Sequence, residues 1–452
     1  MTFDVHRKRV VVVGGGRSGR AAAELLVSKG AQVVLSDTGQ ALDGAGELRA
    51  RGIEVELGPH RADRFAAADL IVVSPGVPFD QEALVAARAV GVPVIGEIEL
   101  AWRWLSGRVI AITGTKGKST TTTLAARMLR EAGFDVTAGG NLGTALSAQV
   151  AESRPSSLHV VEVSSFQLEA TDTFRPWIAV LLNLAHDHLD RHGSFEAYGR
   201  AKARVFANQT PADWAVVNAD DPAALELARN ARARRFDFGV QTPVTPGVTV
   251  DGGQIVRRGP TGATPLLPVT SVRLPGRHLL GDVLAAAAVG TLAGVPPAAM
   301  RRAVEGFNGL EHALERVAEI DGIRFVNDSK ATNVISARRA IESFDRGVVA
   351  IMGGRFKGGD LADLREAVAQ RATAVVAIGE ATPLLHAALD GVTPIHDAAS
   401  MSDAVRQAFA LARPRGVVLL APACASFDMF RDYAERGRAF KDEVGKLKST
   451  PT

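Results

Sequence analysis

Cysteine, aromatic residues and long apolar runs are all scarce in this sequence of 452 residues. It has one cysteine, Cys424, and aromatic side chains make up 5% of the chain. A single cysteine excludes an intrachain disulfide and favours a reducing compartment. No apolar run approaches the roughly twenty residues that a membrane-spanning helix needs. No targeting segment precedes the first expected strand, at 9–13, so we expect a cytoplasmic protein without a membrane partner.

An excess of one charge is also lacking. The chain has 52 Lys and Arg against 49 Asp and Glu, for a formal net charge of +3. No stretch interleaves basic and aromatic residues as nucleic-acid-binding proteins do, so we expect no nucleic-acid partner. Hydrophobic residues make up 46% of the chain, which is enough for several cores. The length favours about three domains.

Segments of strand and helix character alternate along most of the chain. This alternation predicts an α/β fold with mostly parallel sheets and helices on their faces. We expect a Rossmann-like N-terminal domain at 1–96, a central P-loop ATPase-type domain at 97–309 and a Rossmann-like C-terminal domain at 310–452. A stretch rich in Gly, Pro, Thr and Val, at 239–268, predicts short antiparallel strands appended to the central sheet.

The most informative motif follows an apolar strand expected at 108–112. It reads Gly114-Thr115-Lys116-Gly117-Lys118-Ser119-Thr120 and precedes an expected helix. Such a turn points backbone N–H groups at phosphate, its lysine reaches the outer phosphates, and a hydroxyl from Ser119 or Thr120 holds Mg²⁺. The usual P-loop has a glycine where this chain has Ile112. The compressed loop points to one group of ATP-using enzymes.

Metal-binding side chains follow two further strands. Glu162 lies late on an apolar strand, where an unpaired carboxylate is costly; Mg²⁺ would remove that cost, and a salt-bridged strand end is the alternative. His188 is the preferred ligand of a second Mg²⁺. A zinc site made of His186, His188, Asp190 and His192 remains open, although its spacing matches no compact zinc motif. Lys202, on an expected helix, has the sequence context of a lysine that extends to solvent.

A second glycine cluster, Gly14 to Gly19, follows the first strand, and Asp37 ends the next one. This pattern is typical of dinucleotide binding, so a nicotinamide or flavin is one possibility. Another nucleotide diphosphate is favoured, and glycines that only permit tight packing are a third reading. Ser74-Pro-Gly76 should face the same crevice.

Three polar loops in the last domain follow expected strands, at 327–333, 353–360 and 421–433. Together they predict a wall that binds an anionic small molecule. Cys424 is expected to be a small buried residue rather than a nucleophile. Arg431, Arg436 and Arg438 are expected to form a solvated helix face.

Taken together, these motifs resemble the Mur ligase family of peptidoglycan synthesis, over essentially the whole chain. Asn-Asp-Ser-Lys-Ala-Thr-Asn at 327–333 and Ala-Cys-Ala-Ser-Phe-Asp at 423–428 resemble its D-glutamate-adding members. The resemblance implies an ADP-forming ligase that adds D-glutamate to UDP-N-acetylmuramoyl-L-alanine through an acyl phosphate. It also implies ATP, two Mg²⁺ ions and a monomer.

The resemblance also implies residue roles. ATP would contact Gly114, Thr115, Lys116, Gly117, Lys118, Ser119, Thr120 and Asp328. The UDP substrate would contact Arg17, Ser18, Asp37, Thr38, Gly76, Asn141 and Gln167. D-Glutamate would contact Thr332, Lys357, Ser426, Phe427 and Tyr433. Metal ions would be held by Ser119, Thr120, Glu162, His188 and Lys202, the last as the family's carbamylated lysine. Lys118, His188, Lys202 and Lys330 would be catalytic.

The chain departs from the family's usual residues near the adenine. The family's His-Asn-x-x-Asn reads His278-Leu-Leu-Gly-Asp282 here, and its His-Arg reads His312-Ala313. Two other functions remain as alternatives. A ligase like folylpolyglutamate synthase would share the compressed loop, and a nicotinamide-dependent oxidoreductase would follow from the first glycine cluster alone.

Overall fold

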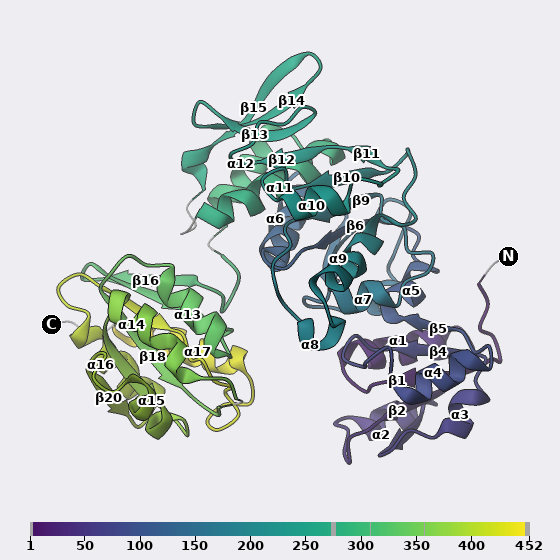
Figure 1. The fold of residues 1–452 in the computed structure, drawn as a ribbon, viewed down its shortest axis with the longest axis horizontal. Coiled ribbons are helices and arrows are strands. Elements are labelled where there is room, and N and C mark those ends of the chain that lie inside the picture. The colour runs from purple at the N-terminus through teal and green to yellow at the C-terminus, as the bar shows by residue number, and fades with distance from the viewer. Residues whose placement is uncertain (1–2, 273–276, 308, 357, 448–452) are drawn as a thin grey trace. The chain divides into compact units, whose positions relative to one another are not determined.

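The computed structural model describes residues 3–272, 277–307, 309–356 and 358–447. They form two compact units, divided after Phe307. The first unit holds two parallel sheets and one small sheet, and the second unit holds one further sheet (Figure 1). The predicted fold class, mostly parallel α/β, is confirmed. In the described residues no helix is both long and apolar enough to cross a bilayer.

The N-terminal sheet contains five parallel strands in the order β3-β2-β1-β4-β5. Its strands are β1 (Arg9–Val13), β2 (Gln32–Asp37), β3 (Glu54–Leu57), β4 (Leu70–Val73) and β5 (Val94–Gly96). Its helices are α1 (Arg17–Ser28), α2 (Ala45–Ala50), α3 (Ala62–Ala66) and α4 (Glu82–Ala89). Strand order reverses between β1 and β4, and loops after such neighbouring strands form a crevice that suits ligands.

The central sheet has six parallel strands in the order β11-β10-β9-β6-β8-β7. Its strands are β6 (Arg108–Thr113), β7 (Val136–Gly140), β8 (Leu158–Glu162), β9 (Ile178–Leu181), β10 (Trp214–Val217) and β11 (Arg234–Arg235). Its helices are α5 (Glu97–Trp102), α6 (Lys118–Glu131), α7 (Ser165–Glu169), α8 (Leu189–His192), α9 (Phe195–Ala203), α10 (Pro222–Leu227), α11 (Arg277–Ala293) and α12 (Pro297–Glu305). β6, β8 and β9 are apolar and buried on both faces, as parallel strands usually are.

The segment at 239–268 was predicted to form short antiparallel strands appended to the central sheet; the antiparallel strands are confirmed, and their place in the central sheet is wrong. It contributes instead to a separate sheet of four strands: β12 (Asp237–Gly239), β13 (Gly247–Asp251), β14 (Gln254–Gly259) and β15 (Gly262–Pro268). β12 pairs with β13 in parallel, and only the later pairs are antiparallel. Helices α11 and α12 pack against this sheet, so its buried apolar side chains have a core of their own.

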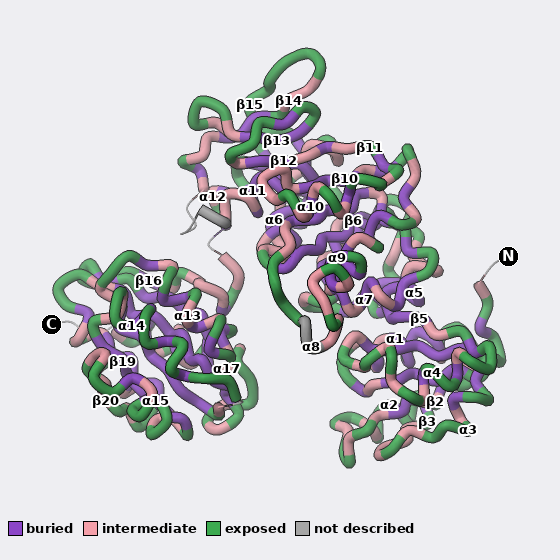
Figure 2. Tube along the Cα trace, viewed as in Figure 1, coloured by how far each residue is buried: buried purple, intermediate pink, exposed green. Residues whose placement is uncertain are grey.

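The second unit contains a six-stranded sheet in the order β16-β17-β21-β18-β19-β20. Its strands are β16 (Glu315–Ile320), β17 (Ile323–Asn327), β18 (Val348–Gly353), β19 (Ala372–Ile378), β20 (Ile395–Ala398) and β21 (Val417–Leu420). Its helices are α13 (Val334–Glu342), α14 (Arg365–Arg371), α15 (Thr382–Leu389), α16 (Met401–Leu411) and α17 (Tyr433–Leu447). All pairs are parallel except the β16–β17 hairpin. Its inner strands are buried (Figure 2), and the polar loops leave them at one edge.

Candidate active site

The phosphate-type loop connects the buried strand β6 to helix α6. Gly114 and Gly117 have positive φ angles of 150° and 81°, which only glycine adopts without strain. Helix α6 begins at Lys118, so its first unpaired backbone N–H groups lie at this loop. The loop therefore has the backbone conformation and the helix N-terminus that favour bound phosphate.

Asn183, after strand β9, supports this loop through its side-chain amide. Its Oδ1 accepts hydrogen bonds from the backbone N–H groups of Thr115 (3.1 Å) and Lys116 (2.9 Å), and its Nδ2 donates to the Lys116 carbonyl (3.0 Å). The hydroxyl of Thr115 is 3.1 Å from that of Tyr198 on α9. Sequence reasoning assigned no role to Asn183, whose position after a strand in a polar segment was the available signal.

Two lysines from distant segments share one carbonyl oxygen in this loop. Lys118 Nζ donates to the Gly114 carbonyl at 2.9 Å, and Lys202 Nζ donates to the same oxygen at 2.7 Å. Lys202 is 1% exposed, so its side chain does not extend to solvent and that simple reading of its sequence context is wrong. Burial, together with the positive charge of Lys118, lowers the pKa of Lys202 to about 7.

Glu162 ends strand β8 beside this pair of lysines and is 3% exposed. Its Oε2 accepts a hydrogen bond from the Ser119 hydroxyl at 2.6 Å, and its Oε1 accepts one from Asn141 Nδ2 at 2.8 Å. The alternative of a salt-bridged strand end is not borne out, because both described partners are neutral. A buried carboxylate beside a hydroxyl is an oxygen donor set of the kind that Mg²⁺ prefers, so the residues present fit this metal.

The histidine-rich segment does not form a zinc site among the described residues. His192 instead contacts Glu169 at 2.9 Å and the Ser165 hydroxyl at 2.9 Å. His186 stacks on Phe195 with ring centroids 4.5 Å apart. The side chain of Asp190 lies outside the described residues.

His188 differs from the other histidines of this segment. Its backbone has a positive φ of 52°, and its ring meets Phe166 edge-on with centroids 4.9 Å apart. The side chain is 49% exposed, so an imidazole nitrogen can reach a ligand. A strained backbone at a non-glycine residue commonly marks a functional position.

The first glycine loop opens onto a cavity of about 450 Å³ at the switch point of the N-terminal sheet. Six of the seven residues predicted to contact the UDP substrate line it: Arg17, Ser18, Asp37, Thr38, Gly76 and Asn141. A Cβ at Gly19 would collide with the Gly14 carbonyl, which explains the need for glycine there. Hydrogen bonds from the backbone N–H groups of Gly15 and Gly39 lower the pKa of Asp37.

Gln167, the seventh of these residues, does not line the cavity. Its side chain forms a capping box with Ser164 at the start of helix α7, and its Oε1 accepts from the Ser164 N–H at 2.9 Å. Its Nε2 is buried without a hydrogen-bond partner in the described part of the chain. Gln167 therefore caps the N-terminus of helix α7, and its Nε2 group remains without a described acceptor.

In the second unit, three polar loops leave β17, β18 and β21, which are neighbours in the sheet. They are hydrogen-bonded to one another through the backbone. Arg355 and Ala425 exchange two bonds of 2.9 Å, and the Ala423 N–H donates to the Ala331 carbonyl at 3.0 Å. The three loops therefore lie side by side, as expected, while their binding of an anionic molecule stays a prediction.

Arg436 on α17 holds the three loops together from beneath. It donates to the hydroxyl and the carbonyl of Ser329 (both 3.0 Å), to the Cys424 carbonyl (3.1 Å) and to the Gly353 carbonyl (3.4 Å). It is 2% exposed, so its predicted place on a solvated helix face is wrong. Burial lowers its pKa to about 10, and it stays charged at neutral pH.

The residues expected to contact D-glutamate lie on or next to these loops. Lys330, Phe427 and Tyr433 are exposed, Thr332 is half-buried and Ser426 is buried. Lys357 lies outside the described residues. Cys424 is fully buried, as predicted.

Two buried carboxyl groups also belong to sites predicted from the sequence. Burial raises the pKa of Asp328 to about 7, and its Oδ1 accepts from the Leu314 N–H at 3.1 Å. Burial raises the pKa of Asp282, on α11, to about 8. Its carboxyl occupies the space where a side chain at Gly117 would lie. Asp282, which stands where the family usually has asparagine, therefore lies against the phosphate-type loop.

Comparison with known proteins gives three family matches along the chain. The Mur ligase MurD-like N-terminal domain matches residues 8–96, the Mur ligase middle domain 112–290, and the Mur ligase glutamate ligase domain 314–424. A protein of Acidobacterium capsulatum named UDP-N-acetylmuramoylalanine–D-glutamate ligase is 48% identical, over 98% of this chain and 97% of its own length. A protein of Koribacter versatilis with the same name is 45% identical, over 98% and 99%.

Solved structures are similar in fold. UDP-N-acetylmuramate-alanine ligase MurC from Thermotoga maritima aligns with a TM-score of 0.60 at 21% identity, over 98% of this chain and all of its own. MurF from Acinetobacter baumannii aligns with a TM-score of 0.58 at 16% identity, over 93% of this chain and 86% of its own. With a phosphate-type loop and a glycine-lined crevice in place and relatives this similar over their whole length, the chain belongs to the Mur ligase family.

Proposed function

We propose that this chain is an ATP-dependent ligase that joins D-glutamate to UDP-N-acetylmuramoyl-L-alanine, a cytoplasmic step of peptidoglycan synthesis. The observation that carries the proposal is the convergence of Lys118, Lys202, Ser119 and Glu162 at one loop. Relatives that carry this name are up to 48% identical over nearly the whole chain. The protein acts as a monomer.

The reaction has two chemical steps. A carboxylate oxygen of the alanine attacks the γ-phosphorus of ATP, ADP leaves, and an acyl phosphate forms. The amine nitrogen of D-glutamate then attacks the carbonyl carbon, phosphate leaves and the amine loses its proton to solvent or a nearby base. Lys118 and the N-terminus of α6 stabilise the charge on the phosphoryl group as it moves.

Two Mg²⁺ ions would be held at the loop. Ser119 or Thr120 with Glu162 would hold one ion, and His188 with Lys202 would hold the other. When bound, the ions supply positive charge beside the transferring phosphoryl group. Asn141, which donates to Glu162 and also lines the UDP cavity, would connect the metal site with the path of the substrate.

Lys202 would act as a carbamate. Its neutral amine attacks the carbon of CO₂, the nitrogen loses a proton, and a carboxylate is created on the side chain. This needs an uncharged amine, and the depressed pKa of Lys202, about 7, makes a large neutral fraction available at physiological pH. The N-terminal cavity would hold the UDP group. Lys330, Thr332, Lys357, Ser426, Phe427 and Tyr433 would surround D-glutamate.

The deciding experiment measures phosphate release with all substrates and with each one omitted. Release should require ATP, UDP-N-acetylmuramoyl-L-alanine and D-glutamate together, and the product should contain a new amide. Equal release with a folate and L-glutamate would instead support a ligase like folylpolyglutamate synthase. Reduction of a nicotinamide without ATP would support an oxidoreductase, and either result would contradict the proposal.

A further inference from the structure

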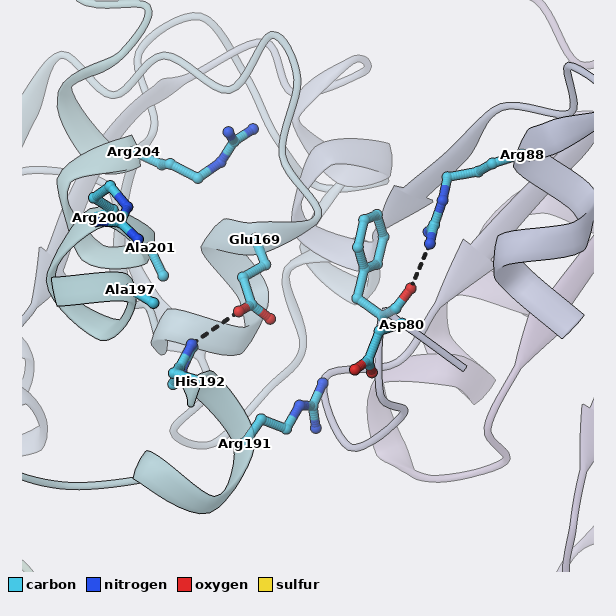
Figure 3. A pocket seen from close by; sticks show the side chains of 10 residues that line it. Asp80, Arg88, Glu169, Arg191, His192, Ala197, Arg200, Ala201 and Arg204 are labelled. Carbon is cyan, nitrogen blue, oxygen red and sulfur yellow. Dashed lines mark hydrogen bonds and ion pairs between the residues drawn. The ribbon is translucent and has the colours of Figure 1, made fainter. Parts of the chain in front are cut away.

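The first unit has another cavity, of about 440 Å³, which shares no lining residue with the nucleotide crevice. One side is formed by the N-terminal domain, with Phe79, Asp80 and Arg88, and the other by helices α7 to α9 of the central domain and Arg204 (Figure 3). Its volume is within the range of small-molecule sites. None of its lining residues has a role in the proposed reaction.

Four arginines line the cavity without a carboxylate partner. Arg88, Arg191, Arg200 and Arg204 make no ion pair of 4.0 Å or less with any described residue. Three of the four arginines donate hydrogen bonds, and their acceptors are uncharged backbone carbonyls. These bonds run from Arg88 to Phe79 (2.8 Å), from Arg191 to Val77 (2.7 Å) and from Arg204 to Leu168 (2.8 Å). Guanidinium groups with only carbonyl acceptors keep most of their charge available to an anion.

Two of these guanidinium groups are already ordered. Arg88 stacks on the Phe79 ring at 4.5 Å, and Arg191 stacks on the Phe166 ring at 4.4 Å. The stacking restricts both side chains before a ligand arrives, so binding costs little side-chain entropy.

The remaining charges leave the cavity positive. Its two carboxylates are Asp80 and Glu169, so four guanidinium groups against two carboxylates give a net charge of +2. Burial lowers the pKa of His192, which disfavours a further positive charge at this ring. Its Nδ1 lies 2.9 Å from Glu169 Oε1, and its Nε2 lies 2.9 Å from the Ser165 hydroxyl.

We propose that this cavity binds a small multivalent anion, either a phosphate or a polycarboxylate. The planar forks of the arginines match both groups, and Phe79, Ala197 and Ala201 offer apolar contact to a short carbon skeleton. The arginines come from both domains, so an anion bound by arginines of both sides would bridge the two domains. Arg191 also binds the backbone of Pro75 and Val77, which line the nucleotide crevice, so occupancy should strengthen binding of the UDP substrate.

The test titrates inorganic phosphate, pyrophosphate and citrate separately into the full chain by calorimetry, at constant ionic strength. A non-hydrolysable ATP analogue and the UDP substrate are present at saturation, so that the phosphate loop and the nucleotide crevice are filled. We expect one saturable site for at least one of these anions and none for chloride. Comparison of pyrophosphate with citrate distinguishes a phosphate ligand from a polycarboxylate ligand.

The double variant Arg88→Gln/Arg200→Gln should weaken this binding about tenfold or more. The matched control Arg346→Gln/Arg415→Gln removes two exposed charges in the other unit and should leave the affinity unchanged. If the double variant does not unfold cooperatively on heating, the single variant Arg200→Gln, at an exposed position, replaces it in the titration. A smaller loss of anion affinity is then expected. Equal affinity in the variant and the wild type, or no binding once both nucleotide sites are filled, would overturn the proposal.

Discussion

The central sheet and the C-terminal sheet place polar loops at the same kind of edge but organise them differently. In the central sheet the phosphate-type loop is one continuous segment, and charged side chains from α6, β8 and α9 converge on it: Lys118, Glu162 and Lys202. In the C-terminal sheet the loops are organised by a buried cation whose described partners are all neutral, Arg436. One edge concentrates charged side chains, and the other uses a buried charge as a structural tie.

The difference shows why one site is easy to recognise and the other is not. Phosphate binding needs successive backbone N–H groups and a lysine in one turn, so its residues must be contiguous. A wall that binds an amino acid can be assembled from three strands, provided that something aligns the loops. Arg436 lies more than one hundred residues from Ser329, which it binds. A contact between residues so far apart in the chain leaves little local pattern in the sequence.

The largest effect should come from Lys118→Ala, which tests the charged edge directly. Loss of its ammonium should reduce the rate of amide formation by at least about 10³-fold, because charge on the moving phosphoryl group is no longer stabilised. The assay is ATP-dependent phosphate release with all three substrates. The matched control is Lys8→Ala, which removes an exposed lysine outside the proposed sites and should lose less than about twofold. Similar losses in both variants would mean that the effect of Lys118→Ala is not specific to the loop.

Next in size is Lys202→Ala, with an expected loss of about 10²-fold or more, because the carbamate is removed. Added acetate should restore part of the activity of this variant by supplying a carboxylate, and it should not stimulate the wild type. Full activity without acetate would contradict the role.

The same lysine predicts a pH dependence. The amine is neutral above its pKa of about 7 and protonated below it. Dependence of the wild-type rate on bicarbonate should therefore be weak above pH 7 and should grow as the pH falls below 7, because less amine is available to hold CO₂. Rates measured from pH 6 to 9, with and without bicarbonate, test this. A bicarbonate requirement that does not change with pH would oppose it.

A smaller effect is expected at the structural tie. Arg436→Lys keeps the charge but cannot make all of the hydrogen bonds to Ser329, Cys424 and Gly353, so the loops should lose alignment. The KM for D-glutamate should rise about tenfold while the KM for ATP stays within about twofold. Arg438→Lys, at an exposed position two residues away, should change neither. An equal rise in both KM values would indicate general destabilisation instead.

The smallest effect should appear at Asp282, beside Gly117. Its carboxyl is protonated below its pKa of about 8, and at higher pH a negative charge develops next to the phosphate loop. The KM for ATP in the wild type should therefore rise a few-fold between pH 7 and 9. Asp282→Asn resembles the protonated form, so its KM should stay flat. Parallel pH profiles for the two proteins would exclude this carboxyl as the cause.

Much of the fold was predictable because its signals are local. The apolar strand at 108–112, the glycine turn and the following helix lie in one continuous segment, and they appear in the structure as β6, the loop and α6. The strands at 239–268 were misplaced because their composition shows that strands form, while sheet partners depend on distant residues. Arg436 was wrongly predicted to be solvated, and no role was predicted for Asn183, because their contacts also depend on residues that are distant in the sequence.

The sequence by itself determined the class of fold, the phosphate-type loop and the glycine-lined crevice, since glycine positions and apolar periodicity follow directly from backbone geometry. Only the tertiary structure decided that Lys202 is buried against Gly114 rather than extended into solvent, that Arg436 joins three loops, and that four arginines surround one cavity. The physical reason is that burial and charge pairing depend on which segments meet, and a depressed lysine pKa or an unpaired guanidinium exists only after they have met.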